Sequence, residues 1–403
     1  MIQVSLGTSK YRLSQLLNLD NQQSQKILEN HYNGNHRGRC HCINDRENRE
    51  LIIKKRKHFY LSKAISTKQN HARSCSFYNL TDKHGSTSIP AIIEKKDGRL
   101  NIKLDSYITK TTNTSNYALN NEEAATNSHR SPTNTRYSTT LLGLLQYIFE
   151  HALLNIWDPN KNFPSSFNSI ANSITNFSEK IDIGRKSNAL SSLLFIPRWH
   201  NNGYSQSAAL NHDKLFEKTN LPGKAAIVIG EVTNWLVSKN NGVYGIKIKY
   251  SKDALWMPNE TATLAMKRFK NEISGISKEN QRILTICIIF RKDNSLRISD
   301  ISFMCVSPDY VPADSSYELA MISKLTQENR KFKKPLCLNG NKFLPDFILL
   351  DTQEKWIIEV FGMMNDSEYN AHTEEKIQYY ENNNIPFLSW FPEKYNEIPN
   401  FPA

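Results

Sequence analysis

The chain has 403 residues and a formal net charge of +12, from 51 lysine and arginine residues against 39 aspartate and glutamate residues. Such a length accommodates a few domains of about 100–200 residues, and the basic balance favours a polyanionic partner, although a basic surface also serves solubility. The sequence has no apolar run of the roughly 18 residues that a transmembrane helix needs and no signal-peptide pattern at its start, which excludes membrane classes and predicts a cytoplasmic location.

Cysteine and histidine residues cluster early in the chain. Cys40 and Cys42 lie in RCHC, and His71 and Cys75 lie in HARSCSFY. Zn²⁺ prefers such ligands in a tetrahedron, and one ion can hold together a segment without its own core. The pattern predicts a structural zinc site, with reduced cysteines beside an incidental histidine as the alternative. Rival ligands are His36, His41, His58 and His84.

Between the two ligand pairs, Leu51–Ile53 and His58–Ile65 predict a hairpin. Its basic turn, which we expect to contact phosphates, consists of Lys54, Lys55, Arg56 and Lys57. A second hairpin is predicted at Ala91–Leu104, because Asp97-Gly98 separates two alternating runs. We therefore expect an N-terminal domain at 1–106. Residues 107–138 are rich in Thr, Asn and Ser and predict a flexible linker.

A middle α+β domain is expected at 139–312. Apolar spacing predicts a helix at Thr140–Trp157, on which Glu150 and His151 are interpreted as a surface pair. From Lys224 the pattern is typical of strands, and with a helix at Glu260–Ile273 it predicts a compact ββαββ unit. Lys247, Lys249 and Tyr250 in this unit predict either a nucleic-acid face or an ordinary solvent-facing strand.

The C-terminal part, 313–403, contains two apolar runs that each hold a carboxylate. Asp346 follows Pro345 near the start of Phe343–Leu350, and Glu359 lies near the end of Trp356–Phe361. On adjacent strands these acids would converge at one edge of a sheet. Paired carboxylates in a partly dry site attract Mg²⁺ or Mn²⁺.

Predicted helices flank these runs. Ser315–Asn329 places Glu318 on its apolar face, and Asp366–Asn382 places Lys376 on a stripe of aromatic residues. A cationic run precedes the first strand and is predicted to grip a DNA backbone, with a solvated face as the alternative. Its basic residues are Arg330, Lys331, Lys333 and Lys334.

This order of helix, strands, helix and final strand resembles the core of the PD-(D/E)xK restriction-endonuclease-like superfamily. The resemblance covers roughly Ser315–Pro392 and implies that Asp346, Glu359 and Glu318 bind Mg²⁺. The chain departs from the usual Glu-x-Lys motif, since Val360 and Phe361 follow Glu359. Some branches of the superfamily carry the lysine on the following helix, and Lys376 stands at such a position.

A second resemblance spans most of the chain loosely. The patches RCHC and HARSCSFY, TLLGLLQYIFEHALLNIWDP, and IEVFGM are similar to an uncharacterised family of proteins carried on integrative and conjugative elements. That resemblance implies the biology of mobile DNA without a settled activity.

The sequence thus predicts an α+β multidomain protein with a zinc-bound N-terminal hairpin segment, a middle domain and a nuclease-like α/β core. The leading interpretation is a Mg²⁺-dependent DNA endonuclease with Glu318, Asp346, Glu359 and Lys376 as catalytic residues. One alternative is a nuclease fold that has lost catalysis and serves DNA binding or assembly. Another is a zinc-stabilised interaction protein. DNA is the expected partner, with other mobile-element proteins and a dimer left open.

Overall fold

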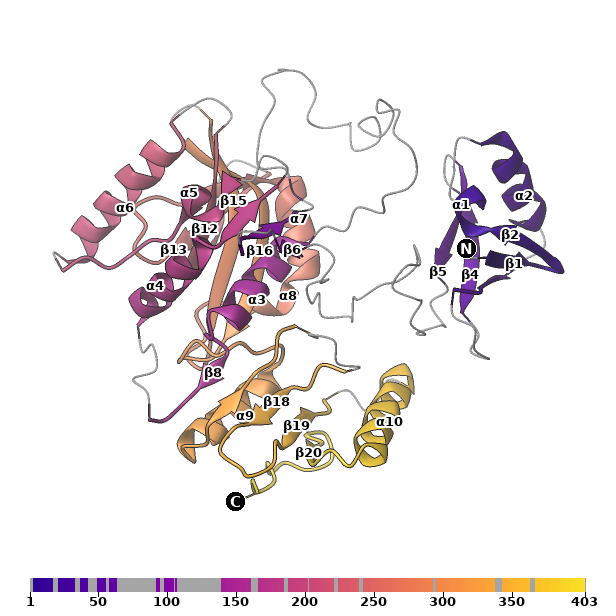
Figure 1. The fold of residues 1–403 in the computed structure, drawn as a ribbon. Helices are drawn as coiled ribbons and strands as arrows, with labels where there is room; N and C mark the ends of the chain where they lie inside the picture. The colour runs from indigo at the N-terminus through magenta and orange to yellow at the C-terminus, as the bar shows by residue number, and fades with distance from the viewer. Residues whose placement is uncertain are drawn as a thin grey trace. The chain divides into compact units, whose positions relative to one another are not determined.

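The computed structural model describes residues 3–16, 21–32, 37–42, 49–55, 58–63, 92–94, 98–104, 106, 139–160, 166–184, 188–201, 203–220, 224–238, 242–292, 295–337, 343–362 and 367–402. The chain divides into two compact units, of which the first holds residues 1–82 and 115–136 and the second holds residues 83–114 and 137–403. The architecture is α+β, with separate sheets and helices in each unit (Figure 1).

The first unit is built on a sheet of order β2-β1-β3-β4-β5. Its elements are β1 (Gln3–Leu6), β2 (Ser9–Arg12), α1 (Leu13–Leu16), α2 (Gln22–Tyr32), β3 (Arg37–Cys40), β4 (Glu50–Lys55) and β5 (Phe59–Lys63). Strands β4 and β5 pair antiparallel from Leu51 opposite Lys63 to Lys55 opposite Phe59, which is the hairpin that the sequence predicts. Alternate apolar residues of these strands, such as Leu51 and Ile53, pack against Leu28 of α2 in one core.

The second predicted hairpin also forms, but it belongs to the second unit. Strands β6 (Ile92–Glu94) and β7 (Leu100–Ile102) pair antiparallel, and β7 pairs in parallel with β9 (Ile181–Ile183), next to β10 (Asn188–Ala189). Because β7 obtains its neighbour from a later part of the chain, the structure does not separate this hairpin from the middle domain at residue 106 as predicted.

The helix predicted at Thr140–Trp157 is shorter than expected, and the residues that follow it form a strand. Helix α3 (Leu141–His151) starts at the N-cap Thr140, whose side chain accepts from the Gly143 N–H. It ends because Leu153 takes a left-handed conformation with φ of 57°, and the N–H of Leu154 donates to Phe149 O, as in a Schellman cap. The chain then forms strand β8 (Ile156–Trp157).

Three further helices lie before the barrel. They are α4 (Phe167–Ser178), α5 (Leu190–Leu193) and α6 (Tyr204–Lys218). Helix α4 falls in a Ser/Asn-rich stretch of the sequence. It forms because Ser166 caps it and because Phe167, Ile170 and Ile174 recur at helical spacing, so that one face is buried.

The strands of the predicted ββαββ unit form, and with an additional strand, β14 (Leu255–Pro258), that the sequence does not predict, they make a closed barrel. The other strands are β12 (Ala225–Val237), β13 (Val243–Ile248), β15 (Arg282–Lys292) and β16 (Ser295–Val306). The order is β12-β13-β14-β16-β15, and β15 pairs back onto β12, while β11 (Leu194–Phe195) adds to β12 outside the ring. Strands β14 and β16 pair in parallel. This is the strand order of an OB-fold barrel.

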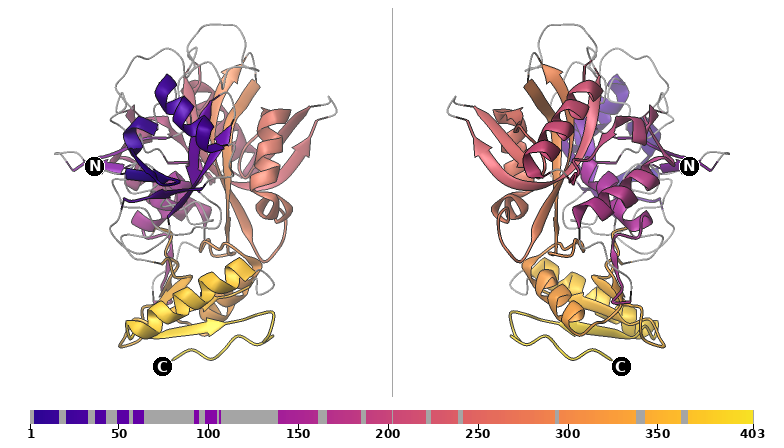
Figure 2. Two further views of the ribbon diagram at one scale, coloured as in Figure 1. Left: turned by 90° about the vertical axis from the view of Figure 1, so that its right-hand side faces the viewer. Right: turned by 90° about the vertical axis from the view of Figure 1, so that its left-hand side faces the viewer.

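The barrel wall is apolar on both sides where β12 and β15 run together. Ala226, Val228 and Cys287 point into the barrel core, whereas Ile227 and Ile286 pack outward with α3 and α4. Helices α7 (Asn259–Arg268) and α8 (Lys270–Ser274) lie alongside the barrel strands (Figure 2). Helix α7 contributes the buried Ala262 and Ala265 to the barrel interior, and the partly buried Ile273 of α8 packs against it. Gly230 is required because a Cβ there would lie 2.3 Å from the Ile248 side chain.

The C-terminal sheet has the order β20-β19-β18-β17-β8. Its strands are β17 (Phe332–Lys333), β18 (Phe347–Leu349), β19 (Ile357–Val360) and β20 (Phe387–Trp390), together with β8, and its helices are α9 (Ser316–Gln327) and α10 (Ser367–Asn382). Strands β17, β18 and β19 form an antiparallel meander, and β20 pairs in parallel with β19 after the α10 crossover. The core between α9 and the sheet includes Ile322, Phe347 and Ile358.

In the part of the chain that the structure describes, no helix has both the length and the apolar character to cross a membrane.

Candidate active site

Asp346 and Glu359 lie at opposing positions at one end of the strand pair β18–β19. The register pairs Phe347 with Ile358 and Ile348 with Ile357, and one step further along it places Asp346 opposite Glu359. Opposed residues of antiparallel strands project to the same face of a sheet. The N–H of Val360 donates to Asp346 Oδ2 at 2.7 Å, which fixes this carboxylate beside the end of β19.

Helix α10 covers Glu359 with polar side chains. Lys376 Nζ donates to Glu359 Oε2 at 2.5 Å and to Leu344 O at 2.9 Å, and Tyr380 Oη donates to Glu359 Oε1 at 2.6 Å. Glu359 has no exposed surface, and Thr373, Lys376 and Tyr380 are all buried, as the stripe on this helix predicts. The Glu359 carboxylate therefore has a donor on each oxygen.

A second cluster lies on the other side of Asp346 and centres on Lys334, which is 1% exposed. Lys334 Nζ donates to Glu318 Oε2 at 2.6 Å, and it lies 3.0 Å from Asp314 Oδ2 and 3.9 Å from Asp346 Oδ1. Glu318 is fixed at the first turn of α9, where its own N–H donates to the N-cap Ser315 and its Oε2 accepts from the Asp314 N–H.

Burial and like charge shift the pKa values of Glu359 and Glu318 in the same direction. Burial, with a contribution from Asp346, raises the pKa of Glu359 to about 7 despite Lys376 and Tyr380. Burial, with contributions from Asp314 and Asp346, raises the pKa of Glu318 to about 8 despite Lys334. For the lysines, burial lowers the pKa, but the surrounding carboxylates outweigh it and raise the pKa of both Lys334 and Lys376.

Two causes act together: burial, which is the larger one for both glutamates, and the surrounding carboxylates, which raise the pKa of the acids and of the lysines. Among the described residues of the site, four carboxylates face two lysines, and one of these carboxylates, Asp314, is exposed. A buried negative excess favours retention of a proton on an acid, and it equally favours the binding of an additional cation. The carboxylates are Asp314, Glu318, Asp346 and Glu359.

The structure thus brings Asp346, Glu359 and Lys376 together, and it connects Glu318 to them only through Lys334. In the described residues, no group of three or more His, Cys, Asp and Glu side chains is placed to hold a metal ion. Glu318 therefore does not join the other two acids in a three-carboxylate set, because Lys334 occupies the space between Glu318 and Asp346.

The prediction that Lys334 belongs to an exposed, DNA-gripping run is wrong in its placement of this side chain. Phe332 and Lys334 are buried on either side of the partly exposed Lys333, which is the alternation expected at a strand. That alternation is visible in the sequence and identifies Lys334 as an inward-facing residue. Tyr380 is a further site residue that the sequence does not single out, although it lies on the same stripe as Lys376.

The other cations of this run are engaged by acids. Arg330 pairs with Asp351 at 2.8 Å, Lys331 pairs with Asp158 at 2.9 Å, and Lys333 pairs with Glu150 at 2.5 Å. These ion pairs connect the segment of β17 to the turn between β18 and β19 and to the chain around β8. Contact with a DNA backbone remains a prediction for these three residues.

Glu150 is not the surface residue that the sequence predicts. It is 4% exposed, and its Oε2 accepts from Asn155 Nδ2 and from the Leu336 N–H, both at 2.8 Å. It therefore fixes the chain that leads out of β17.

The predicted zinc ligands are only partly within the described residues. Cys40 is buried at the end of β3, and Cys42 follows it with partial exposure, whereas His71 and Cys75 lie outside the described residues. In the basic turn, Lys54 and Lys55 are exposed, and Arg56 and Lys57 lie outside the described residues. The zinc site and the phosphate contact of this turn stay predictions.

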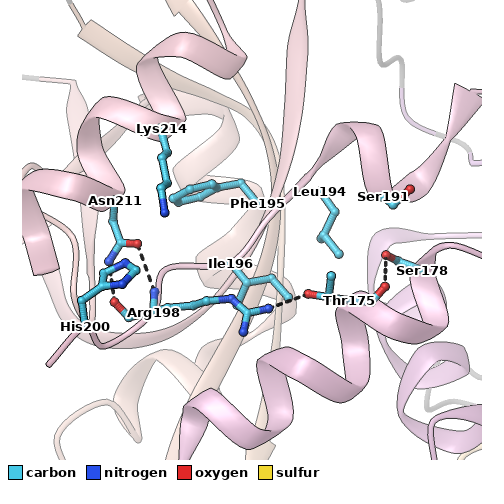
Figure 3. A pocket seen from close by; sticks show the side chains of 10 residues that line it. All are labelled: Thr175, Ser178, Ser191, Leu194, Phe195, Ile196, Arg198, His200, Asn211 and Lys214. Atoms are coloured by element: carbon cyan, nitrogen blue, oxygen red, sulfur yellow. Dashed lines mark hydrogen bonds between the residues drawn. The ribbon is translucent and has the colours of Figure 1, made fainter.

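A cavity of about 210 Å³ lies away from these acids, between α4, β11 and α6. Arg198 spans it and donates to Thr175 Oγ1 at 2.8 Å, while Lys214 reaches toward Phe195 from α6 (Figure 3). Asn211 on its wall accepts from the Arg198 N–H and donates to Arg198 O. These bonds hold the segment after β11 in place.

Comparison with known proteins identifies the family. A family profile described as "Protein of unknown function (DUF1173)" matches residues 11–392, and the chain therefore belongs to this family. A search of curated protein sequences finds no match.

Proposed function

We propose that the C-terminal sheet of this DUF1173 member is the core of a Mg²⁺-dependent DNA endonuclease of the PD-(D/E)xK type, serving a mobile genetic element. The observation that carries the proposal is the constellation of Asp346 and Glu359 at opposed strand positions with Lys376 bonded to Glu359. Two acids and a lysine at one end of a strand pair are the groups that metal-assisted phosphodiester hydrolysis requires.

The topology of the sheet supports the same proposal. Helix α9 precedes the meander β17-β18-β19, and α10 then returns the chain to β20, parallel to β19. This is the order of elements that the PD-(D/E)xK resemblance implies. In this arrangement, the helix after the second acidic strand covers the acid, so that a lysine on α10 replaces one on β19.

The donor set fits Mg²⁺. This ion binds hard oxygen ligands, retains several waters and commonly needs only one or two carboxylates from the protein. Asp346 has a side chain that is 22% exposed, so solvent and substrate oxygens have access to it. Glu359 and the main-chain carbonyl of Val360 would supply the other oxygens. When bound, the ion would act as a Lewis acid on the phosphate and would lower the pKa of an attacking water.

The protein's own groups prepare this site. Lys376 is held between Leu344 O and Glu359, so its ammonium group is positioned to orient a water or to neutralise charge developing on the phosphate. Tyr380 fixes the second oxygen of Glu359. Lys334 balances Asp346 and Glu318 from the other side and limits repulsion among the acids.

A cleavage assay on plasmid, duplex and single-stranded DNA tests the proposal. We expect nicking or cutting in Mg²⁺ or Mn²⁺ that EDTA abolishes. Lys376→Met should lower the rate by about 100-fold or more, the scale of one positioned proton-transfer or electrostatic group. Lys355→Met, which removes an exposed lysine before β19, serves as the control and should leave the rate unchanged. Cleavage that is equal in both variants would exclude Lys376 from the site.

Cleavage should also depend on pH in a defined direction. The pKa of Glu359 is raised to about 7 by burial, and a metal ligand must be deprotonated. The rate in limiting Mg²⁺ should therefore rise from pH 6 to pH 8 as Glu359 loses its proton. Saturating Mg²⁺ should shift this rise to lower pH, since the ion competes with the proton. A profile that is flat over this range at limiting metal contradicts the role of Glu359.

The same contacts also favour a second function, a nuclease fold without catalysis that binds DNA or assembles with other proteins of the element. In the described residues, each oxygen of Glu359 and one oxygen of Glu318 already has a hydrogen-bond donor from a side chain. If these ion pairs persist in Mg²⁺, the protein would retain DNA in a salt-dependent manner without cutting it. Retention without product in either metal would identify this second function.

A further inference from the structure

The outer face of β13 carries basic side chains that the barrel does not need for its core. Ile246 and Ile248 are buried in the barrel interior, so alternation places Gly245, Lys247 and Lys249 on the outside. Lys247 and Lys249 are both partly exposed. The strand therefore presents a short row of cations to its exterior.

An aromatic group lies at one end of this row. The ring centroid of Tyr250 is 5.6 Å from that of Trp199 and 5.9 Å from that of Tyr204. Trp199 is 38% exposed and Tyr204 is 48% exposed. Lys249 Nζ lies 5.6 Å from the centroid of Tyr250, so a cation borders the aromatic surface.

This aromatic group is held in place by the scaffold. Tyr250 has a φ of 60°, a conformation that tyrosine rarely adopts, and its carbonyl accepts from Asn211 Nδ2 at 2.9 Å. The Asn211 side chain also accepts from the Arg198 N–H and donates to Arg198 O, directly before Trp199. Figure 3 shows Asn211 facing Arg198. One buried asparagine thus joins the three segments that carry the rings. A strained residue fixed at an exposed aromatic surface is more consistent with binding than with packing.

A further aromatic side chain lies at the other end of the row. Trp256 of β14 is opposite Gly245, and a Cβ on Gly245 would lie 2.8 Å from its ring, so the indole lies closely over the glycine. Arg297 of β16 is the neighbour of Trp256 on the next strand. Both side chains are partly exposed.

Among the described residues of this surface, basic side chains outnumber acidic ones. The buried carboxylate of Glu231, which is 7% exposed, forms ion pairs with Lys249 and Arg282, each at 3.1 Å. These two cations and one acid leave a positive excess. The exposed Asp253 is paired with His212. Lys247 and Arg297 add further positive charge beside Trp256.

We propose that this surface, the β13 face, binds single-stranded nucleic acid. The β13 face consists of Tyr204, Lys247, Lys249, Tyr250, Trp256 and Arg297. Single strands are bound by aromatic rings on which bases stack and by cations that follow the phosphates, and the β13 face has both. The distance along β13 from Gly245 to Lys249 is about 13 Å at about 3.3 Å per residue, which suits two or three nucleotides. The OB-fold order of the strands agrees with this by analogy only.

Binding of the full chain to labelled oligonucleotides, measured by fluorescence anisotropy in EDTA, tests the proposal separately from cleavage. The probes are oligothymidylate, oligouridylate and a duplex of about 20 nucleotides, which exceeds the site of one barrel. We expect at least one single strand to bind more tightly than the duplex. Tyr204→Ala should weaken that binding by about tenfold, whereas Tyr395→Ala, which removes a tyrosine that is 63% exposed elsewhere, should not.

The salt dependence gives a second measure. The double variant Lys247→Gln, Arg297→Gln should reduce the slope of log affinity against log salt by about 1.4, or about 0.7 for each phosphate that is no longer neutralised. The exposed pair Lys270→Gln, Lys278→Gln is the matched control and should leave the slope unchanged. Equal affinity for duplex and single strands, an unaffected Tyr204→Ala variant, or no binding to either single strand would overturn the proposal. Cleavage without such binding would overturn it and leave the nuclease proposal intact.

Discussion

Asp346→Asn is expected to reduce metal-dependent DNA cleavage by about 1,000-fold, the equivalent of losing several kcal/mol of charge stabilisation in the transition state. Asparagine keeps the shape of aspartate, and its carbonyl oxygen still accepts from the Val360 N–H that now bonds Asp346 Oδ2. The end of β19 should therefore stay in place, while the anionic ligand that is most accessible to solvent is lost. The rate of product formation at saturating Mg²⁺ measures the effect.

The control is Asp309→Asn, the same chemical change at an exposed position of the same unit. It should cut DNA at the parental rate. A titration with Mg²⁺ separates weak metal binding from lost chemistry, since the first is recovered at high metal concentration. If the parental protein cuts DNA and Asp346→Asn cuts equally well, the active site lies elsewhere in the chain.

Lys334→Met is expected to destabilise the C-terminal sheet by about 3–5 kcal/mol, the cost of removing one partner from a buried ion pair. Lys334 is 1% exposed and faces Glu318, Asp314 and Asp346, so its loss leaves a buried negative excess. Hydrogen exchange of the amides in β18 and β19 measures the free energy of local opening. Faster exchange in these strands, with unchanged exchange in the barrel strands, assigns the loss of stability to the C-terminal sheet.

Lys331→Met is the comparison, because its side chain is 38% exposed and its partner Asp158 keeps a hydrogen bond from the Asn160 N–H, so the loss of stability should be smaller than at Lys334. The double variant Lys334→Met, Glu318→Gln removes both members of the buried pair. It should be less destabilised than the sum of the single changes, since the remaining amide carries no uncompensated charge. Equal effects at Lys331 and Lys334 would contradict the assigned burial.

The elements of the C-terminal sheet could be predicted because their patterns are local. Short apolar runs and capped helices indicate where strands and helices lie, and the opposed register of Asp346 and Glu359 follows from a tight connection between two strands. The role of Lys334 could not be obtained in this way. Its partner Glu318 lies on the preceding helix α9, and its partner Asp346 lies just before β18. The run of cations around Lys334 suggests an exposed segment, although its apolar neighbours indicate burial.

The barrel shows a different limit. The sequence indicates β12, β13, β15 and β16 by their apolar runs and the turn residues between them. Closure depends on β15 pairing with β12, about fifty to sixty-five residues away, and on the parallel pairing of Trp256 with Arg297. Long-range pairings leave no local pattern. Helix α4 is hard to predict for another reason, because the composition of its polar face conceals the spacing of Phe167, Ile170 and Ile174.

The short strand β8 has a consequence for any attempt to dissect the protein. It donates the edge of the C-terminal sheet, with Ile156 opposite Lys333 and Trp157 opposite Phe332, and it is contributed by a segment that precedes the barrel. A fragment that starts at residue 313 would therefore lack the strand that covers β17 and would expose an unpaired, aromatic edge prone to self-association. Removal of the barrel would likewise break the chain connection between β8 and the other strands of the C-terminal sheet. A large deletion in either the barrel or the C-terminal sheet is therefore expected to disturb both.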